Sequence, residues 1–269
     1  MRVVIVTGGT AGLGRVMVEA LLDAGHRVVA VSRSGASDLA PSDRLLVVRG
    51  DVASADDAET VVARTIAHFG ALDALVNNAG LNLPTAAKTP DGVRARRFYD
   101  VGLDEWHAIM RVNVDGPFHM ARAATPHLVA RGWGRIVNHV TSFRTMVRAG
   151  EAPYGPSKAA LEAMTTIWAA ELKDSGVTVN AILPGGASDT RMIARDIVPD
   201  RTKLIPPSVM AAPIRFLLSD AADGVTARRI TAALWKPGAS DADNLAAAAA
   251  PAGWAETVAA YPAPPWPPR

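Results

Sequence analysis

The sequence of 269 residues predicts one doubly wound α/β domain, in which a mostly parallel sheet is covered by helices on both faces. Three observations predict this fold class. Short runs rich in valine and isoleucine recur, and they are continuously apolar, as strands buried on both faces are. Helical patterns separate these runs, and a glycine-rich turn follows the first run. Hydrophobic residues make up 49% of the chain, which allows a large core.

The apolar runs predict a mostly seven-stranded parallel sheet. Between the first two runs, the residues from Leu13 to Leu21 show the i, i+3, i+4 spacing of one helix face, and Gly25 is where that helix should stop. A second helical stripe, from Val61 to Ile66, is closed by Gly70. The predicted strands are Val3–Val6, Arg27–Val31, Leu45–Val48, Ala74–Val76, Arg135–Val140, Val177–Ile182 and Arg229–Leu234.

The alternation of strands and helices ends near residue 240, which divides the chain into a domain of residues 1–240 and an Ala/Pro-rich C-terminal tail of residues 241–269. Proline density forbids a regular helix or a central strand at the end of this tail. Two interpretations stay open. The tail packs on the body or on a neighbouring subunit through Trp254, Tyr261 and Trp266, or it is a loosely ordered end.

Composition argues against several function classes. Lys and Arg number 28 against 26 Asp and Glu, without a basic stripe, so we expect no nucleic-acid partner; the cluster Arg94, Arg96 and Arg97 is interpreted as a solvated loop. The absence of cysteine excludes disulfides and thiolate sites, and the histidines lack metal-site spacing, so no metal is expected. His139 is interpreted as a core histidine. With no signal peptide or membrane span, we expect a cytoplasmic protein.

The first predicted strand runs directly into the turn TGGTAGLG, which begins at Thr7. Glycines at 8, 12 and 14 allow a tight turn, and they let backbone N–H groups and a helix N-terminus approach a pyrophosphate. The spacing is G-x-x-x-G-x-G rather than the commoner G-x-G-x-x-G. Its position between the first strand and the first helix favours a dinucleotide site over a mere tight connection.

The end of the second predicted strand carries Ser32 and Arg33 where an NAD site usually has an acidic residue for the ribose 2′-hydroxyl. A guanidinium suits a bidentate grip on a 2′-phosphate instead. We therefore expect NADP as the cofactor, with NAD as the alternative. The competing interpretation is that Arg33 simply points to solvent.

The segment YGPSK places Tyr154 and Lys158 at i and i+4, on the same side of a helix. A phenol has a pKa near 10 and a nearby ammonium favours its phenolate, so this spacing suits a general acid or base for alcohol and carbonyl chemistry. Gly155 and Pro156 fit the first turn of the helix, where the missing N–H of proline costs nothing. Taken alone, a surface Tyr and Lys on one helix face would be an ordinary pair.

The motifs together resemble the short-chain dehydrogenase/reductase superfamily over residues 1–240. They follow the family's order: the TGGTAGLG turn, Asp51–Val52, NNAG from Asn77, Asn113, the Thr141–Ser142 pair, YGPSK and NAILPGG from Asn180. The resemblance implies that residues 1–240 are a single NAD(P)-binding Rossmann catalytic domain. It also implies a homotetramer or homodimer.

The resemblance implies that Asp51 and Val52 hold the adenine ring, that the NNAG segment lines the adenosine half of the cofactor, and that Pro184 to Thr190 embrace the nicotinamide carboxamide. Taken singly, Asp51 would also suit a helix cap, and the NNAG turn would also suit a strand end. Thr190 comes one residue later than in the family pattern. The expected cofactor-binding residues are Gly8, Thr10, Gly12, Leu13, Gly14, Ser32, Arg33, Asp51, Val52, Asn78, Ala79, Gly80, Tyr154, Lys158, Pro184, Gly185 and Thr190.

The resemblance assigns Tyr154 as the general acid or base, Lys158 as its tuner and ribose ligand, and Asn113 as the anchor of a proton-relay water. The family's substrate-binding serine usually lies thirteen residues before the tyrosine, which is Thr141, whereas Ser142 lies twelve before. Either hydroxyl can donate to a carbonyl oxygen. We prefer Ser142, with Thr141 as the rival.

These residues predict an NAD(P)-dependent oxidoreductase that interconverts a secondary alcohol and a ketone by hydride transfer. The segment from Gly186 to Pro207 is expected to close over this small-molecule substrate. Two alternatives remain: a catalytically silent NADP-binding sensor or scaffold, and a non-redox epimerase or dehydratase on the same fold.

Overall fold

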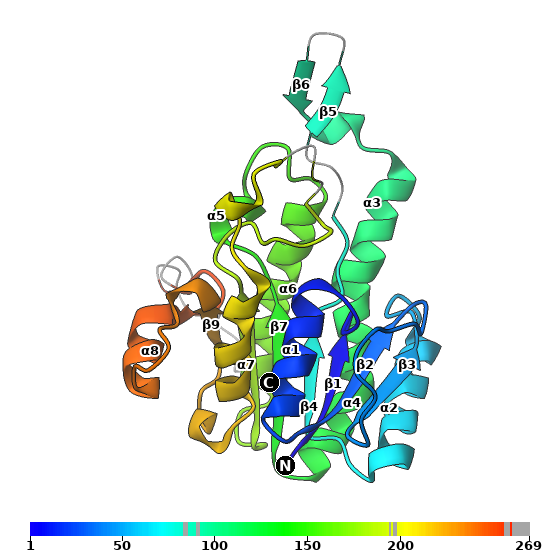
Figure 1. Ribbon diagram of the computed structural model, residues 1–269, viewed down its shortest axis with the longest axis vertical. Coiled ribbons are helices and arrows are strands. Elements are labelled where there is room, and N and C mark those ends of the chain that lie inside the picture. Colours follow the sequence, from blue (N-terminus) through cyan, green and yellow to red (C-terminus); the bar gives the residue numbers. More distant parts are fainter. Residues whose placement is uncertain (83–85, 90–91, 194, 196–197, 256–258, 260–269) are drawn as a thin grey trace, which may run out of the picture.

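The computed structural model describes residues 1–82, 86–89, 92–193, 195, 198–255 and 259. At its centre is an eight-stranded sheet with the strand order β10-β9-β8-β7-β4-β1-β2-β3 (Figure 1). The first seven of these strands in the chain are parallel, and β10 pairs antiparallel with β9 at one edge. The sheet strands are β1 (Val3–Thr7), β2 (Arg27–Ser32), β3 (Leu45–Arg49), β4 (Ala74–Asn77), β7 (Gly134–His139), β8 (Val177–Leu183), β9 (Arg228–Thr231) and β10 (Ala249–Pro251).

The predicted doubly wound α/β fold is confirmed, and the seven predicted strands are all present. Residues 232–234 form a 3₁₀ turn instead of the end of the last predicted strand. Arg94 lies in a small separate hairpin, β5 (Ala86–Thr89) and β6 (Gly92–Ala95), rather than in a loop. This hairpin extends beyond the carboxyl ends of the sheet strands (Figure 1).

Helices cover both faces of the sheet. The helices α1 (Gly12–Asp23), α7 (Ala211–Leu217) and α8 (Asp241–Ala248) pack on one face, and α2 (Ala55–Phe69), α4 (Gly116–Ala130) and α6 (Tyr154–Glu171) pack on the other. Along β1, Val4 and Val6 enter the first core, whereas Val3 and Ile5 enter the second. This alternation between two buried faces explains why the strands are apolar without interruption.

The remaining elements are short. The helix α3 (Leu103–Met110) continues through a π turn (Arg111–Asp115) into α4, and α5 (Phe143–Met146) is a single turn. The 3₁₀ turns are Phe98–Asp100, Arg201–Lys203, Pro207–Met210, Asp220–Ala222 and Ala232–Leu234. Among the described residues, no helix is long and apolar enough to cross a membrane.

The segment assigned to the C-terminal tail begins with regular structure. Residues 241–251 form α8 and β10, and β10 extends the sheet beside β9. Trp254, which follows β10, stacks on Phe143. Tyr261 and Trp266 lie outside the described residues.

The strand order reverses between β1 and β4, because the chain fills one side of the sheet up to β3 and then resumes on the other side of β1. Open α/β sheets bind ligands in the crevice at the carboxyl ends of the strands beside such a reversal. A ligand site is therefore expected at the carboxyl ends of β1, β4 and β7.

Candidate active site

The glycine turn after β1 has no room for side chains at two of its positions. Gly8 has a φ of +64°, and a Cβ placed on Gly14 would lie 2.2 Å from the carbonyl oxygen of Gly8. This packing brings the start of α1 against the end of β1. Glycine is therefore required by both conformation and contact at the point where a cofactor pyrophosphate would approach.

The N-terminus of α1 is suited to an anion. Its N-cap residue, Ala11, makes no side-chain capping bond, and the first turn contains no acidic residue. The first N–H groups of the helix thus have no capping side chain, and the helix dipole adds positive potential there. The residues present fit a dinucleotide pyrophosphate.

Asn78 joins the ends of three strands. Its Nδ2 donates to the carbonyl oxygen of Thr7 at 2.9 Å and to that of Gly8 at 3.3 Å, and its Oδ1 lies 3.2 Å from Nδ1 of His139. Because the amide nitrogen already donates to these carbonyls, Oδ1 accepts a proton held on Nδ1 of His139. Thr7 Oγ1 also accepts the N–H groups of Asn78 and Ala79, both at 3.0 Å. Asn78 therefore braces the glycine turn.

His139 is a structural residue at the end of β7, as its sequence context predicted. Burial, with a smaller contribution from the charge of Lys158, lowers the pKa of His139 to about 3. The imidazole is consequently neutral at physiological pH, which agrees with its hydrogen bond to Asn78.

The residues expected at the adenosine end lie at the ends of β2 and β3. Ser32 Oγ accepts the N–H of Gly35 at 3.2 Å and closes a turn after β2. Arg33 is exposed and has no hydrogen bond or ion pair with any residue in the described part of the chain. The side chain of Asp51 accepts the N–H of Ala53 at 3.0 Å, and Ser54, not Asp51, caps α2. The guanidinium of Arg33 is thus available for a phosphate.

Beyond β8, the chain approaches the glycine turn at Thr190. Gly185 has a φ of +104°, and Pro184 accepts the N–H of Ala233 at 3.0 Å. The Thr190 side chain lies opposite Gly12, with its Cγ2 3.5 Å from a Cβ placed there. Thr190 is therefore beside the glycine turn despite its late position in the sequence.

Hydrogen bonds join the two ends of the segment that begins at Ala187 and ends at Ile205. Ile205 donates to the carbonyl oxygen of Ala187 at 2.8 Å, and Asp189 donates to that of Ile205 at 3.0 Å. Arg201 pairs with Asp189 at 2.5 Å and donates to the carbonyl oxygen of Thr190 at 3.1 Å. Residues 194, 196 and 197 of this segment lie outside the described residues.

Tyr154 and Lys158 lie in the first turn and a half of α6. Gly155 lies so close to the preceding loop that a Cβ on it would be 2.5 Å from the carbonyl oxygen of Met146. Lys158 is 2% exposed, and its Nζ lies 5.9 Å from the centre of the Tyr154 ring. Nζ donates to the carbonyl oxygen of His139 at 2.7 Å. The start of α6 is thereby joined to the end of β7.

Burial dominates the acid–base properties of this pair. It lowers the pKa of Lys158 to about 8. Burial, and next the charge of Glu151, raise the pKa of Tyr154 to about 12, while a hydrogen bond with Thr141 lowers it. The sequence predicted that Lys158 would lower the phenol pKa, but burial and Glu151 outweigh any such effect. The Tyr154 phenol is thus protonated at neutral pH.

The geometry favours Thr141 over Ser142, contrary to our preference from the sequence. The Thr141 hydroxyl lowers the pKa of Tyr154 through side-chain hydrogen bonding, whereas Ser142 has no such effect on it. Ser142 instead caps α5: its Oγ accepts the N–H of Thr145 at 3.1 Å and lies 2.9 Å from Thr145 Oγ1. One residue of the pair faces the site, and the other holds the helix that follows.

Asn113 lies in the π turn between α3 and α4, fully buried. Its Oδ1 accepts the N–H of Leu81 at 2.8 Å, and its Nδ2 donates to the carbonyl oxygen of Leu81 at 2.9 Å and to Ser157 Oγ at 3.0 Å. A Cβ on Gly80 would lie 3.4 Å from Asn113 Oδ1 and 3.6 Å from Lys158 Nζ, so both side chains border Gly80. The Asn113 amide fastens the chain after β4 to α6.

Glu151 is a site residue that the sequence reasoning missed. Its side chain is 3% exposed and pairs with Arg148, and its charge raises the pKa of Tyr154. The available signal was an acidic residue three positions before the tyrosine. A cleft of about 570 Å³ lies beside it, lined by Arg96, Arg97, Phe98, Tyr99, Arg148, Ala149, Gly150 and Ala152.

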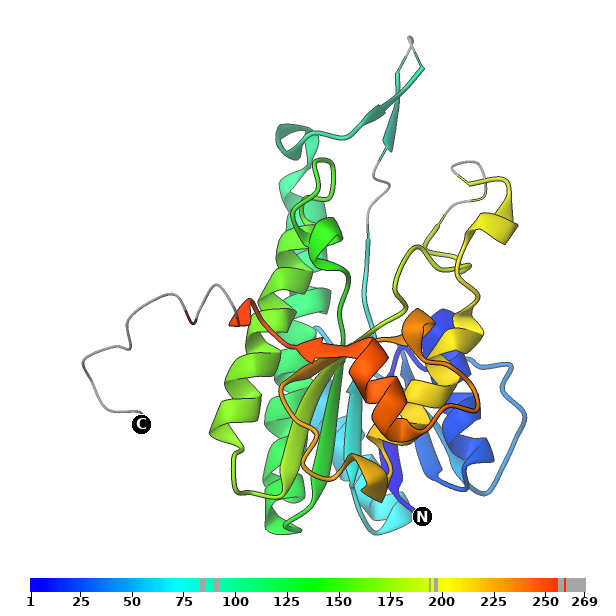
Figure 2. The same cartoon turned by 90° about the vertical axis from the view of Figure 1, so that its left-hand side faces the viewer.

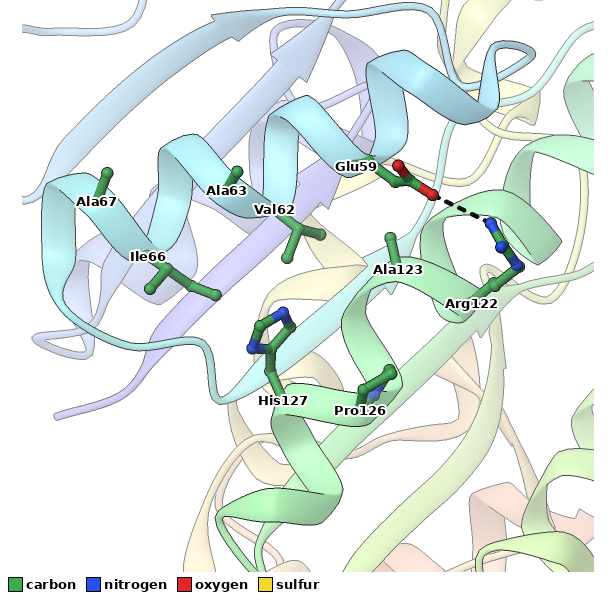
Figure 3. A pocket seen from close by; sticks show the side chains of 9 residues that line it. All are labelled: Glu59, Val62, Ala63, Ile66, Ala67, Arg122, Ala123, Pro126 and His127. Carbon is green, nitrogen blue, oxygen red and sulfur yellow. Dashed lines mark hydrogen bonds and ion pairs between the residues drawn. The ribbon is translucent and has the colours of Figure 1, made fainter.

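A larger cavity, of about 740 Å³, lies elsewhere (Figure 3). It is a mostly apolar groove between α2 and α4, with the Glu59–Arg122 ion pair at one end. None of the residues that line it belongs to the expected site. Within the described ranges, no group of three or more acidic or histidine side chains could hold a metal ion. Most of the residues expected to serve acid–base chemistry and cofactor binding instead lie near the carboxyl ends of the sheet strands.

Comparison with known proteins agrees with this class of α/β dinucleotide-binding site. The family model described as short chain dehydrogenase matches residues 2–198. The chain belongs to this family of NAD(P)-dependent oxidoreductases. The resemblance inferred from the motifs is therefore confirmed.

Individual relatives match most of the chain. It is 31% identical to "Nodulation protein G" of Azospirillum brasilense over 241 residues, which are 84% of this chain and 94% of the relative. It is 32% identical to "Acetoacetyl-CoA reductase" of Shinella zoogloeoides over 244 residues, 86% of this chain and 96% of the relative. A crystal structure of a 3-ketoacyl-(acyl-carrier-protein) reductase from Brucella melitensis complexed with NADH matches with a TM-score of 0.73 at 28% identity, covering 84% of this chain and 93% of that one.

Proposed function

We propose that this protein is an NADP(H)-dependent reductase that interconverts a ketone and a secondary alcohol, with Tyr154 as the general acid or base. The observation that carries the proposal is the Tyr154 phenol, whose pKa responds to Thr141 and which lies near Lys158, with a glycine turn suited to a dinucleotide at the same edge of the sheet. Two similar proteins are named as reductases of 3-oxoacyl thioesters, so such thioesters are the first substrates to test.

The chemistry follows from the two hydroxyl groups. Bound NADPH would supply the hydride. As negative charge develops on the carbonyl oxygen, the Tyr154 hydroxyl donates its proton to it. With substrate bound, the Thr141 hydroxyl would direct its one proton to the same oxygen, so that the developing charge meets two donors.

Lys158 serves both the cofactor and the phenol. Its Nζ lies 5.9 Å from the centre of the Tyr154 ring and donates to the carbonyl oxygen at the end of β7. There it would bind the ribose hydroxyls of the nicotinamide half. A cation there favours the tyrosinate that proton donation leaves behind. Asn113 is proposed to anchor a relay water that returns the proton, through a polar group other than its side-chain amide, because that amide already holds Leu81 and Ser157.

The cofactor contacts are proposed from the fit of the residues. Gly8, Thr10, Gly12, Leu13 and Gly14 would hold the pyrophosphate at the α1 N-terminus. Ser32 and the unpaired Arg33 would bind the 2′-phosphate of NADP. The other contacts would come from Asp51, Val52, Asn78, Ala79, Gly80, Pro184, Gly185 and Thr190. The chain is further proposed to form a homodimer or homotetramer.

A direct assay tests the proposal. The protein is incubated with NADPH and a short 3-oxoacyl thioester, and the absorbance of the reduced cofactor is followed. We expect depletion that Tyr154→Phe reduces by about 10²-fold or more while NADPH binding persists. Full activity in Tyr154→Phe would refute the role of the phenol, and binding of NADPH without turnover of any ketone would indicate a silent cofactor-binding protein.

A further inference from the structure

A buried ion pair lies under the candidate active site and is used by none of the roles above. Glu162 on α6 is fully buried, Arg229 on β9 is 8% exposed, and Oε1 of the glutamate lies 3.3 Å from Nε of the arginine. Burial raises the pKa of Glu162 and lowers that of Arg229. Removing two charges from water is costly, and such a pair is weak evidence for stability by itself. Its contacts indicate another role.

Arg229 reaches the residue that bonds the Tyr154 phenol. Its Nη2 donates to the carbonyl oxygen of Thr141 at 2.8 Å. In the sheet register, Arg229 lies beside Ala181 and Ala181 lies beside Asn138, three residues before Thr141. The side chain therefore extends from β9 across β8 to the chain just beyond β7. A guanidinium has several fixed donors, so one can hold Thr141 while another faces Glu162.

The loop that carries Thr141 is fixed at three successive residues. Val140 donates to the carbonyl oxygen of Ile182 at 2.9 Å, and Ser142 caps α5. Between them, the carbonyl oxygen of Thr141 is held by Arg229. The orientation of this peptide determines where the Thr141 hydroxyl lies relative to the Tyr154 phenol.

The C-terminal segment holds Arg229 from the other side. The guanidinium lies 3.6 Å from the centre of the Phe143 ring, and the Phe143 ring stacks on Trp254 with centres 5.6 Å apart. The N–H of Gly253 donates to Glu162 Oε1 at 2.9 Å. Figure 2 shows the segment after β10 passing across α6.

Only glycine fits at residue 253. Its φ is +63°, and a Cβ there would lie 2.5 Å from Oγ1 of Thr166. The C-terminal segment is therefore built to approach α6 closely at Glu162, one helical turn beyond Lys158.

We propose that Arg229 is a positioning residue for the carbonyl chemistry: it holds the Thr141 backbone so that the Thr141 hydroxyl faces Tyr154. Glu162 and the segment Gly253–Trp254 in turn hold Arg229. This inference rests on the function proposed above. It assigns a positioning role to the C-terminal segment through its contacts with Glu162 and Phe143.

The test compares Arg229→Met with Arg228→Met. Arg228 is the neighbouring residue on β9, and its side chain makes no hydrogen bond or ion pair within the described part of the chain, which makes it a matched control. In Arg229→Met we expect kcat to fall on the order of tenfold to a hundredfold with an unchanged Kd for NADPH, because a small displacement of a reacting group has effects of this size. Arg228→Met should retain kcat.

Two further readouts separate positioning from a loss of stability. The pH profile of alcohol oxidation should move to higher pH in Arg229→Met, because the hydrogen bond from Thr141 that lowers the pKa of Tyr154 is weakened. Hydrogen exchange should be faster in peptides that contain residues 141–146. A lower Tm with kcat, pH profile and exchange all unchanged would overturn the inference.

Other outcomes remain decisive. If Arg229→Met does not fold, Trp254→Ala takes its place, since it keeps both charges and removes only the ring behind Phe143; unchanged kcat and exchange in that variant would overturn the inference. If the wild type reduces no ketone, the proposed function fails, and the exchange of residues 141–146 still decides whether Arg229 holds the loop.

Discussion

Lys158 Nζ donates a hydrogen bond to the main-chain carbonyl oxygen of His139 at 2.7 Å. This bond joins the first turns of α6 to the end of β7, the strand that leads into Thr141. Tyr154, the proposed acid or base, and Thr141 therefore come from two elements that a lysine joins. The roles of the residues around this junction can each be measured.

The two adjacent hydroxyl residues should fail in different ways. Thr141→Ala removes the hydroxyl that bonds the Tyr154 phenol, and we expect kcat for ketone reduction to fall about tenfold or more, because a donor to the developing oxyanion is lost. Ser142→Ala removes a helix cap and should lower the free energy of unfolding by about 1 kcal/mol with kcat nearly unchanged. Steady-state kinetics and chemical denaturation check both; the reverse pattern would restore Ser142 as the substrate hydroxyl.

Glu151 should set the pH range of alcohol oxidation. Its carboxylate raises the pKa of Tyr154, so Glu151→Gln removes that contribution and lowers the phenol pKa. Oxidation needs the ionised phenol, and its rate therefore rises with pH; in the variant this rise should occur at lower pH. The profile of kcat against pH measures the pH at which this rise occurs. Glu105→Gln is the control, because it breaks an ion pair with Arg96 and Glu105 does not contribute to the raised pKa of Tyr154.

Arg33 should determine the preference for NADP. Arg33→Ala removes a guanidinium that has no partner among the residues that the structure describes. We expect the KM for NADPH to rise about tenfold or more while the KM for NADH changes little, because a charge-assisted contact to phosphate is lost. Equal effects on both cofactors would show that Arg33 does not bind the 2′-phosphate. Arg44 offers a control position: it lies between β2 and β3, and its side chain donates to the carbonyl oxygen of Leu22 in α1.

His139 should make the fold sensitive to acid. Its pKa is about 3 in the folded protein, against an ordinary value of 6.5, so the unfolded chain binds more protons between these values. Stability is therefore lost as pH falls from about 6.5 towards about 3. His139→Gln keeps a donor for Asn78 and has no such titration, and its Tm should fall less between pH 7 and pH 4. Parallel Tm curves for the two proteins would contradict this account.

Much of the fold could be predicted because its signals are local. The apolar runs mark strands buried on both faces, and Gly8 and Gly14 occupy positions where no other residue fits. The spacing of Tyr154 and Lys158 is fixed by the helix itself, and the structure places them in α6 as the pattern indicated.

The finer details of the site depend on contacts between distant segments. Which way Thr141 and Ser142 face depends on where α5 begins and on bonds to β8 and β9, and the local sequence does not report these contacts. The pKa of Tyr154 depends on burial and on Glu151, neither of which the Tyr–Lys spacing reports. Likewise, β10 has only three residues and acquires its partner from the fold.

The pairing of β10 with β9 has a consequence for the edge of the sheet. Without β10, the backbone N–H and C=O groups of β9 would be open on one side, and an open strand is a template for pairing with other chains. β10 covers that edge, and it ends in Pro251, which offers no N–H to a further strand. A chain shortened at residue 240 would therefore be prone to aggregate. The C-terminal segment thus protects the sheet against uncontrolled growth.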